Sequence, residues 1–298
     1  MPPSFIKLHG FGNDYIVIES DELEAADSPG EFSQRICNRH YGAGADGIAL
    51  ITPPADQSAD FNVRIFNPDG SEASLSGNGT RCAAAYLYYR QMWTGDQLRL
   101  GTRAGVKLYS LREHSDPGRY IFDSELGQPK FDSDSIPMTT SDRMEKVIDY
   151  DLEVAGQLFA VTALQMGNPN CCIFVDDFDT IDWRLIGKHL ETHEQFPDRT
   201  NVVFIRVKNR KTIELRIWER GVGETMASGT CSCAAAVAAM IKGETERCID
   251  VLMPGGKARI HWQGESDTGE VVITGAAEVI YGGEWLAPTD YPADYRPD

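Results

Sequence analysis

Two segments of the chain alternate between apolar and polar positions with a period of two residues. The apolar positions are Phe61, Val63 and Ile65 in the first segment and Ile213, Leu215 and Ile217 in the second, with mostly polar residues between them. This alternation is typical of a strand with one buried face, because successive side chains point to opposite faces of a sheet. It predicts half-buried strands over residues 61–66 and 213–218.

A similar run of small residues follows each predicted strand. It extends from Gly70 to Ala85 in the first half and from Gly223 to Ala236 in the second, with one residue more in the first copy. Each copy has a glutamate four residues before a Ser-Gly pair, and then a cysteine before three alanines. The paired serines, Ser76 and Ser228, are 152 residues apart, which is about half the chain. Similarity at this spacing indicates internal duplication.

Each copy continues into a segment that is apolar nearly all round, over Ala83–Tyr89 and Ala234–Met240. A helix with so few polar positions is buried on every side. We expect short strands after each helix, at 98–102 and 106–111 in the first half and at 249–253 and 258–262 in the second. The prediction is an α/β fold of the α+β kind, with two pseudo-symmetric lobes, each a curved, mainly antiparallel sheet around a central buried helix.

The duplication also sets the expected domain limits. We place an N-terminal lobe at residues 1–130 and a C-terminal lobe at residues 131–285, from which the chain end is able to return to the N-terminal lobe. The polar stretch Asp132–Glu145 is interpreted as a linker region. Residues 286–298 form a tail, rich in Pro, Asp and Tyr, that either covers the surface or lacks fixed structure.

Charge and cysteine usage narrow the classes of partner and compartment. A formal net charge of −17 over 298 residues argues against nucleic acid or an anionic membrane as a partner, because either polyanion would be repelled. The sequence shows no apolar signal-peptide core and no apolar run long enough to cross a bilayer. Seven cysteines without framework spacing suit a reducing compartment. We therefore expect a cytoplasmic protein.

Two motifs that resemble ligand sites are better explained structurally. Gly42–Gly47 matches the dinucleotide pattern G-x-G-x-x-G, but it precedes an apolar run instead of following a strand and opening a helix, so we interpret it as a turn. The cysteines at 171, 172, 231 and 233 lack the paired spacing of a zinc site and are expected to pack as small buried hydrophobes. No metal site is predicted.

The two Ser-Gly turns are the candidate binding site. Each lies where a turn enters a buried helix, so unpaired backbone amides and the positive end of the helix dipole meet there. Such a helix start binds a carboxylate, and two of them can hold one α-carboxylate from both sides. The simpler alternative is that Ser76 and Ser228 are N-caps. Glu219-Arg220 is a candidate buried pair for an ammonium and a carboxylate, with a surface ion pair as the alternative.

At these residues the chain resembles the diaminopimelate epimerase family. The motifs that carry the resemblance are Lys7–Tyr15, Arg64–Glu72, Met166–Pro169, Asn201 and Glu219–Gly221, and the likeness runs over almost the whole chain. It implies an isomerase that works without pyridoxal phosphate or any other cofactor and interconverts LL- and meso-diaminopimelate for lysine and cell-wall synthesis. It also implies the two-lobed fold and a possible homodimer.

The resemblance further implies which residues form the site. In the family, two cysteines face each other across the substrate α-carbon, one removing its proton and the other supplying a proton to the opposite face. Those catalytic positions fall on Ser76 and Ser228 here, whereas Cys82 and Cys233 match cysteines further along the helices and are expected in the core. The substrate contacts carry over to Asn13, Asn67, Gly77, Asn78, Asn168, Asn201, Glu219, Arg220, Gly229 and Thr230. The asparagines with Glu219 and Arg220 are expected to recognise the distal end, and the glycine turns the reacting end.

The two serines are a serious departure from the family pattern. A thiol has a pKa near 8.5 and an alcohol one near ~15.7, so forming the base costs on the order of 10 kcal/mol more. A helix dipole recovers roughly 1–2 kcal/mol of that, and neither motif contains a histidine that activates a hydroxyl. A second, smaller departure is Asn170, where the family usually has histidine.

Three hypotheses follow. In the first, the chain is an epimerase whose two catalytic cysteines were deliberately changed to serine, leaving an inert form with an intact site. In the second, the serines are natural and the protein is a diverged isomerase or dehydratase of a related small acid, which Asn170 favours. In the third, it is a non-catalytic protein that binds an amino acid.

Overall fold

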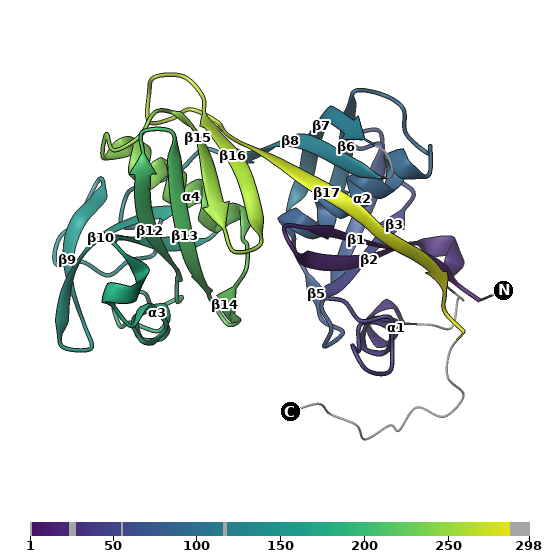
Figure 1. The fold of residues 1–298 in the computed structure, drawn as a ribbon, viewed down its shortest axis with the longest axis horizontal. Helices are drawn as coiled ribbons and strands as arrows, with labels where there is room; N and C mark the ends of the chain where they lie inside the picture. Colours follow the sequence, from purple (N-terminus) through teal and green to yellow (C-terminus); the bar gives the residue numbers. More distant parts are fainter. Residues whose placement is uncertain (1, 24–27, 55, 116–117, 287–298) are drawn as a thin grey trace.

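Two lobes lie side by side in the computed structural model, which describes residues 2–23, 28–54, 56–115 and 118–286 (Figure 1). The N-terminal lobe contains β1 (Ser4–Gly10), β2 (Asn13–Glu19), α1 (Pro29–Ile36), β3 (Gly47–Thr52), β4 (Phe61–Phe66), β5 (Glu72–Ala73), α2 (Gly77–Tyr89), β6 (Gln97–Thr102), β7 (Gly105–Ser115) and β8 (Arg119–Gly127). Within the expected tail, residues 287–298 lie outside the described part of the chain.

The second series of elements repeats the order of the first. After β9 (Val147–Val154) come β10 (Gln157–Gln165), β11 (Pro169–Phe174), α3 (Trp183–Glu191), β12 (Asn201–Asn209), β13 (Thr212–Glu219), β14 (Gly223–Thr225), α4 (Gly229–Ile241), β15 (Cys248–Met253), β16 (Gly256–Trp262) and β17 (Val271–Glu284). With β9 set aside, β10 to β17 follow the order of β1 to β8, helices included. Short 3-10 turns at Ser20–Glu22 and Phe178–Thr180 complete the described elements. The predicted duplication is confirmed.

Strand pairing is mainly antiparallel, as predicted. The parallel pairs are β2–β3 and β4–β6 in the first lobe and β11–β12 and β13–β15 in the second, so they too occur in equivalent places. The strands predicted from alternation are β4 and β13, where Val63, Ile65, Leu215 and Ile217 are buried. The short strands expected after each helix are also present, as β6 and β7 in the first lobe and β15 and β16 in the second.

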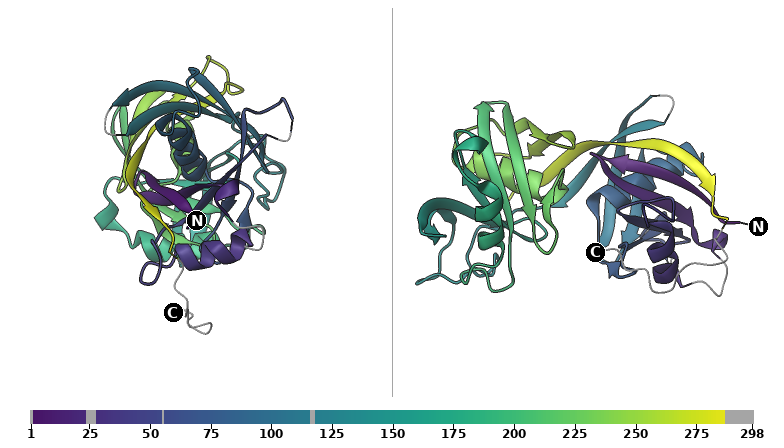
Figure 2. Two further views of the ribbon diagram at one scale, coloured as in Figure 1. Left: turned by 90° about the vertical axis from the view of Figure 1, so that its right-hand side faces the viewer. Right: turned by 60° about the horizontal axis from the view of Figure 1, so that its bottom comes forward.

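Helices α2 and α4 form the centre of the two lobes. Ala83, Ala84 and Ala85 are fully buried in α2, as are Ala234 to Ala236 in α4. The helix of the first lobe is surrounded by strands, which Figure 2 (left) shows. Alanine favours this arrangement because its short side chain lets the sheet approach the helix closely, to the packing density of a protein interior. Tyr89, the last residue of α2, is an exception to the predicted burial and is 42% exposed.

The stretch interpreted as a linker has no regular structure, but it is packed. Ile136 and Met138 are buried in a core cluster together with Trp183 of α3 and Phe204 of β12. Part of the expected linker region is therefore packed against the second lobe, because its few apolar side chains are buried there.

Two other sequence interpretations, the glycine-rich turn and the buried cysteines, fit the structure. Gly42–Gly47 is a turn that leads into β3, and Gly44 has a φ of +71°. Six of the seven cysteines are buried free thiols, and Cys248 is exposed. Within the described residues, no group of three His, Cys, Asp or Glu side chains is arranged to hold a metal ion. None of the helices described is long and apolar enough to span a membrane.

Strand β17 joins the two lobes. It begins beside β16 in the second lobe, pairs with β8 through Val271 to Glu278, and ends beside β1 of the first lobe, where Glu284 lies opposite Ser4. Figure 2 (right) shows this long strand crossing from one lobe to the other. Because it is hydrogen-bonded to strands of both lobes, β17 restricts how the lobes move relative to each other.

Phe11 makes a second connection between the lobes. It lies in the turn between β1 and β2 with a φ of +57°, yet its ring belongs to the core cluster of the second lobe. A Cβ atom at Gly255 would lie 2.1 Å from the Phe11 carbonyl oxygen, and one at Gly275 would lie 2.7 Å from its ring. The guanidinium of Arg81 lies over the same ring at 4.7 Å. The β1–β2 turn of the N-terminal lobe is thus packed into the C-terminal lobe.

Replacing Phe11 tests this connection. We expect Phe11→Ala to lower the free energy of unfolding by about 3–5 kcal/mol, because it empties a buried ring site. Denaturant unfolding measures the change, and Leu158→Ala is a control at a side chain that is 68% exposed. Equal small losses for both variants would contradict the role given to Phe11.

Candidate active site

Ser76 begins helix α2 and receives two hydrogen bonds on its hydroxyl oxygen. The backbone N–H of Gly79 donates to Oγ at 3.0 Å, which is the geometry of an N-cap. The Tyr15 hydroxyl donates to the same Oγ at 2.8 Å. Tyr15 comes from β2, which lies next to the helix start because β1, β2 and β3 all pack against α2. The cap interpretation therefore holds for Ser76 and does not explain its bond to Tyr15.

Ser228 occupies the equivalent position before α4 but has different partners. Its side chain makes no cap to the helix and donates instead to Glu219 Oε2 at 2.9 Å. Glu219 ends β13 and is partly buried. Burial raises the pKa of its carboxyl group, although the hydrogen bond from Ser228 lowers it in part. A cap alone therefore does not account for Ser228.

The glycine after each serine leaves the helix amides accessible. A Cβ atom at Gly77 would have no neighbour within 4 Å, and one at Gly229 would meet only Ile273, at 3.9 Å. Packing within the protein therefore does not require glycine at either position. The first amides of a helix lack partners inside the helix, so both starts present donors to an anion.

Several contacts bring the two helix starts near each other. Helices α2 and α4 touch, and a Cβ atom at Gly12 would lie 3.7 Å from Met226, two residues before Ser228. Burial raises the pKa of the Tyr15 phenol, its bond to Ser76 lowers it, and the charge of Glu219 is among those that raise it further. The Tyr15–Ser76 and Glu219–Ser228 pairs, from different lobes, are thus within electrostatic range.

In the first lobe, two of the predicted asparagines belong to one chain of hydrogen bonds. Asn13 donates to Asp46 at 2.7 Å and accepts from Asn78 at 3.1 Å. Asn78 in turn accepts from Arg81 at 2.5 Å, and Arg81 donates to the Ala276 carbonyl of β17 at 3.1 Å. The side chain of Asn67 instead holds its own turn by donating to Ser71 at 2.9 Å.

In the second lobe, the predicted asparagines also meet. Asn170 donates to Asn168 Oδ1 at 3.1 Å and accepts from Asn201 at 3.3 Å. Asn201 Oδ1 accepts the backbone N–H of Arg220 at 2.9 Å. Asn170, the residue that departs from the family histidine, is completely buried in this network.

Thr230 lies beside the same turn. A Cβ atom at Gly167, next to Asn168, would lie 3.7 Å from Thr230 Cγ2. The network of asparagines therefore borders the start of α4.

Glu219 and Arg220, the candidate pair for an ammonium and a carboxylate, are not buried together and have separate partners. Arg220 is exposed and donates to the Asp198 carbonyl at 2.9 Å, whereas Glu219 binds Ser228. Adjacent residues at a strand end point in opposite directions, which explains the separation.

Sequence reasoning did not single out Tyr15, Asp46 or Arg81. A signal was present for Arg81, because it is the one charged residue of α2 and is followed directly by the apolar run of that helix. Tyr15 lies in the Lys7–Tyr15 motif and Asp46 in the glycine-rich turn, but nothing local indicated their roles, since their partners are distant in sequence.

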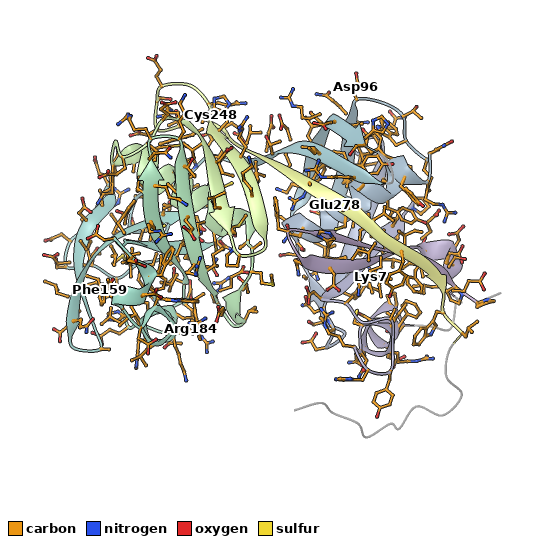
Figure 3. All side chains as sticks on the ribbon, in the orientation of Figure 1. Lys7, Asp96, Phe159, Arg184, Cys248 and Glu278 are labelled. Carbon is orange, nitrogen blue, oxygen red and sulfur yellow. The ribbon has the colours of Figure 1, made fainter. Side chains whose placement is uncertain are left out.

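A shallow cavity of about 290 Å³ lies elsewhere, on the outer face of β7, β8 and β15–β17. Its lining includes Arg112, Asp123 and Cys248, the last of which Figure 3 labels on β15. None of its lining residues belongs to the two serine pairs or to the asparagine networks, so we do not assign the chemistry to it.

Comparison with known sequences gives one consistent family. The diaminopimelate epimerase family model matches residues 5–131 and 162–280. The diaminopimelate epimerase of Pelotomaculum thermopropionicum is 41% identical over 283 residues, covering 94% of this chain and 98% of that protein. The protein of the same name from Desulforudis audaxviator is 39% identical, with 95% and 99% coverage.

Solved structures share the fold at much lower identity. A probable proline racemase from Agrobacterium radiobacter superposes with a TM-score of 0.68 at 12% identity, covering 98% of this chain and 94% of that one. A phenazine biosynthesis protein of the PhzF family from Bacillus anthracis superposes with a TM-score of 0.66 at 17% identity, with 96% and 100% coverage. These likenesses concern the two-lobed architecture alone.

The raised pKa of Glu219 gives a pH-dependent prediction. The folded state holds the proton more tightly than the unfolded state, so stability falls as the pH rises above the ordinary glutamate pKa of about 4.3. Glu219→Gln should therefore be more stable than the parent at neutral pH and lose this advantage in acid. Denaturant unfolding at several pH values measures it.

Glu214 on the same strand is the matched control. Although burial acts to raise it, the hydrogen bond from Arg206 holds the pKa of Glu214 below its usual range. Glu214→Gln should consequently lose stability at neutral pH. If both variants changed stability in the same direction, the environment assigned to Glu219 would be wrong.

Proposed function

This chain belongs to the diaminopimelate epimerase family, and we propose that it binds diaminopimelate with its α-carbon between residues 76 and 228. The observation that supports this most directly is the pair of duplicated helix starts. Each offers unpaired amides beside a glycine whose missing side chain leaves open space, and each carries a hydroxyl held by a partner from its own lobe. Such an arrangement suits an α-carboxylate approached from two sides.

The second-lobe residues are proposed to recognise the distal end of the substrate. The Arg220 guanidinium is exposed and, among the described residues, donates only to the Asp198 carbonyl, which leaves donors for a carboxylate. Asn168 and Asn201 are oriented beside it through Asn170. Asn13 and Asn78 already bond to each other, so we assign them mainly to shaping the first helix start, with Asn67 at the adjoining turn.

With serine at both reacting positions, we propose that the chain binds this substrate and epimerises it slowly or not at all. An alkoxide is about 7 pKa units harder to form than a thiolate. The partners found here do not remove that barrier: Tyr15 is a buried phenol whose pKa is raised, and Glu219 is a carboxylate. Neither is a base strong enough to ionise an alcohol.

One observation favours a second candidate function. Ser228 donates to a carboxylate whose pKa is raised, so the Ser228 oxygen could take up a substrate proton while its own hydroxyl proton passes to Glu219. The Ser228–Glu219 pair therefore fits a naturally diverged isomerase of a related small acid better than it fits an inert epimerase. Binding without catalysis is the third outcome. A homodimer stays a prediction.

Restoring the thiols tests the main proposal. We expect Ser76→Cys combined with Ser228→Cys to gain epimerase activity by several orders of magnitude, which corresponds to the barrier of on the order of 10 kcal/mol. Exchange of the substrate α-proton in deuterated water, followed by NMR, measures the rate. Each single variant should stay far below the pair, because both faces of the α-carbon need a thiol.

Three outcomes separate the candidates. An unaltered chain that already exchanges the α-proton rapidly would support the diverged isomerase. Binding of diaminopimelate without exchange, even after both thiols are restored, would support the non-catalytic alternative. No binding by any variant would refute the proposed substrate.

The helix amides are tested separately by adding a methyl group. We expect Gly77→Ala to weaken diaminopimelate binding by about tenfold or more, because it obstructs a hydrogen bond to a charged group. The fold should be unaffected, since no atom lies within 4 Å of the new Cβ. Calorimetric titration measures binding, and unchanged affinity would contradict the proposed carboxylate site.

Gly79→Ala is the informative contrast. Its Cβ would lie 2.9 Å from both Ile65 and Tyr15, so this variant should lose stability. The two glycines, two residues apart in one helix, thus separate a ligand effect from a packing effect.

A further inference from the structure

The two reacting positions have opposite hydrogen-bonding environments, although duplication made them equivalent. The side-chain oxygen of Ser76 accepts from the Tyr15 hydroxyl and from the Gly79 amide. The hydroxyl of Ser228 instead donates to Glu219 Oε2. One position is thus surrounded by donors, and the other faces a carboxylate.

Tyr15 is fixed in place by its surroundings. It is 6% exposed, and Cβ atoms at Gly47 of β3 and Gly79 of α2 would each lie 2.9 Å from ring atom Cε1. Because both glycines pack directly against the ring, the phenol has little freedom to turn away from residue 76. Its position is therefore part of the resting structure and does not depend on a ligand.

Donors and a carboxylate act in opposite directions on a negatively charged atom. A hydrogen bond to an anion is stronger than one to a neutral group, and the start of α2 adds a favourable dipole. An anion at position 228 has a helix start as well, but it lies against the Glu219 carboxylate, and like charges at this distance repel. The difference between the two positions therefore comes from their side-chain partners.

We propose that Tyr15 is a positioning residue of the reaction, whose hydroxyl makes residue 76 the member of the pair on which negative charge is stabilised. The inference rests on the proposed function, and it applies to the thiol form of the site. There, the resting enzyme holds a thiolate at position 76 and a thiol at position 228.

The proton transfers then balance without any further reactant. The sulfur anion at position 76 takes the α-proton, and the electron pair of the C–H bond stays on the α-carbon. The thiol at position 228 gives its proton to the opposite face of that carbon, where the new C–H bond forms, and becomes the anion. Tyr15 keeps its own proton throughout, which its burial favours.

Other ionisable groups near the two positions do not change which of them better stabilises a negative charge. Cys82, Asp46 and Glu219 act on Tyr15, and Cys231 and Glu219 interact near Ser228. The negative charges of Asp46 and Glu219 oppose an anion at position 76. Glu219 bonds directly to residue 228, so its effect is larger there and the order of the two positions is kept.

The test compares the titration of single thiols introduced at the two positions. Ser76→Cys and Ser228→Cys are prepared separately, and alkylation by iodoacetamide is followed against pH by peptide mass spectrometry. The pH midpoint is the readout because it does not depend on how accessible each thiol is. Cys248, which is exposed, serves as an internal reference in every sample.

We expect the thiol at position 76 to titrate about one pH unit or more below the thiol at position 228, a tenfold difference in thiolate fraction. Adding Tyr15→Phe should raise the midpoint at position 76 by about one unit and leave position 228 unchanged. Tyr109→Phe is the matched control, because it removes another buried phenol that bonds to Thr80 of the same helix and does not touch Ser76.

The proposal is overturned if position 76 titrates at or above position 228, or if Tyr15→Phe and Tyr109→Phe shift position 76 equally. Should Tyr15→Phe fail to fold, the comparison of positions 76 and 228 still decides the order. Epimerase activity of the variant with both thiols is measured separately. Titration as expected without activity would contradict the proposed function alone, whereas activity with the reverse titration order would contradict only the role of Tyr15.

Discussion

The packing of Phe11 into the opposite lobe is the interaction on which the geometry of the site depends. The turn that carries it leads directly into Asn13 and Tyr15, and the glycine turn that receives it bonds to Met226 just before Ser228. Burying one ring therefore sets the distance between the groups that flank the two helix starts. Arg81 strengthens this contact, since its fully buried guanidinium lies over the Phe11 ring and bonds to β17.

Arg81 also explains why the first-lobe asparagines are arranged as they are. A buried guanidinium without a carboxylate partner needs neutral acceptors, and those described are Asn78 and the Ala276 carbonyl. Asn78 then orients Asn13, which in turn reaches Asp46. The polar network thus links the β17 crossing to the start of α2, and it gives these asparagines a structural role besides any contact with a ligand.

The two helix starts correspond to each other in the repeat, yet their surroundings differ. Ser76 has a tyrosine and caps its helix, whereas Ser228 has a glutamate and leaves its helix uncapped. A symmetric site would treat both faces of a substrate alike. On the proposed function, the different partners would let one face favour loss of a proton and the other its delivery.

The sequence by itself determined the repeating unit, the strands β4 and β13, and the two buried helices. These features are encoded locally, in the alternation at 61–66 and 213–218 and in the alanines after Cys82 and Cys233. The sequence also marked Ser76, Ser228 and their glycines, because duplication placed them in matching contexts. Only the tertiary structure decided that Tyr15 meets Ser76 across 61 positions, that Glu219 turns to Ser228 and away from Arg220, and that β17 and Phe11 join the lobes. Those contacts join residues whose closeness arises from sheet pairing and packing between lobes, and no local pattern of hydrophobic and polar residues records such a pairing.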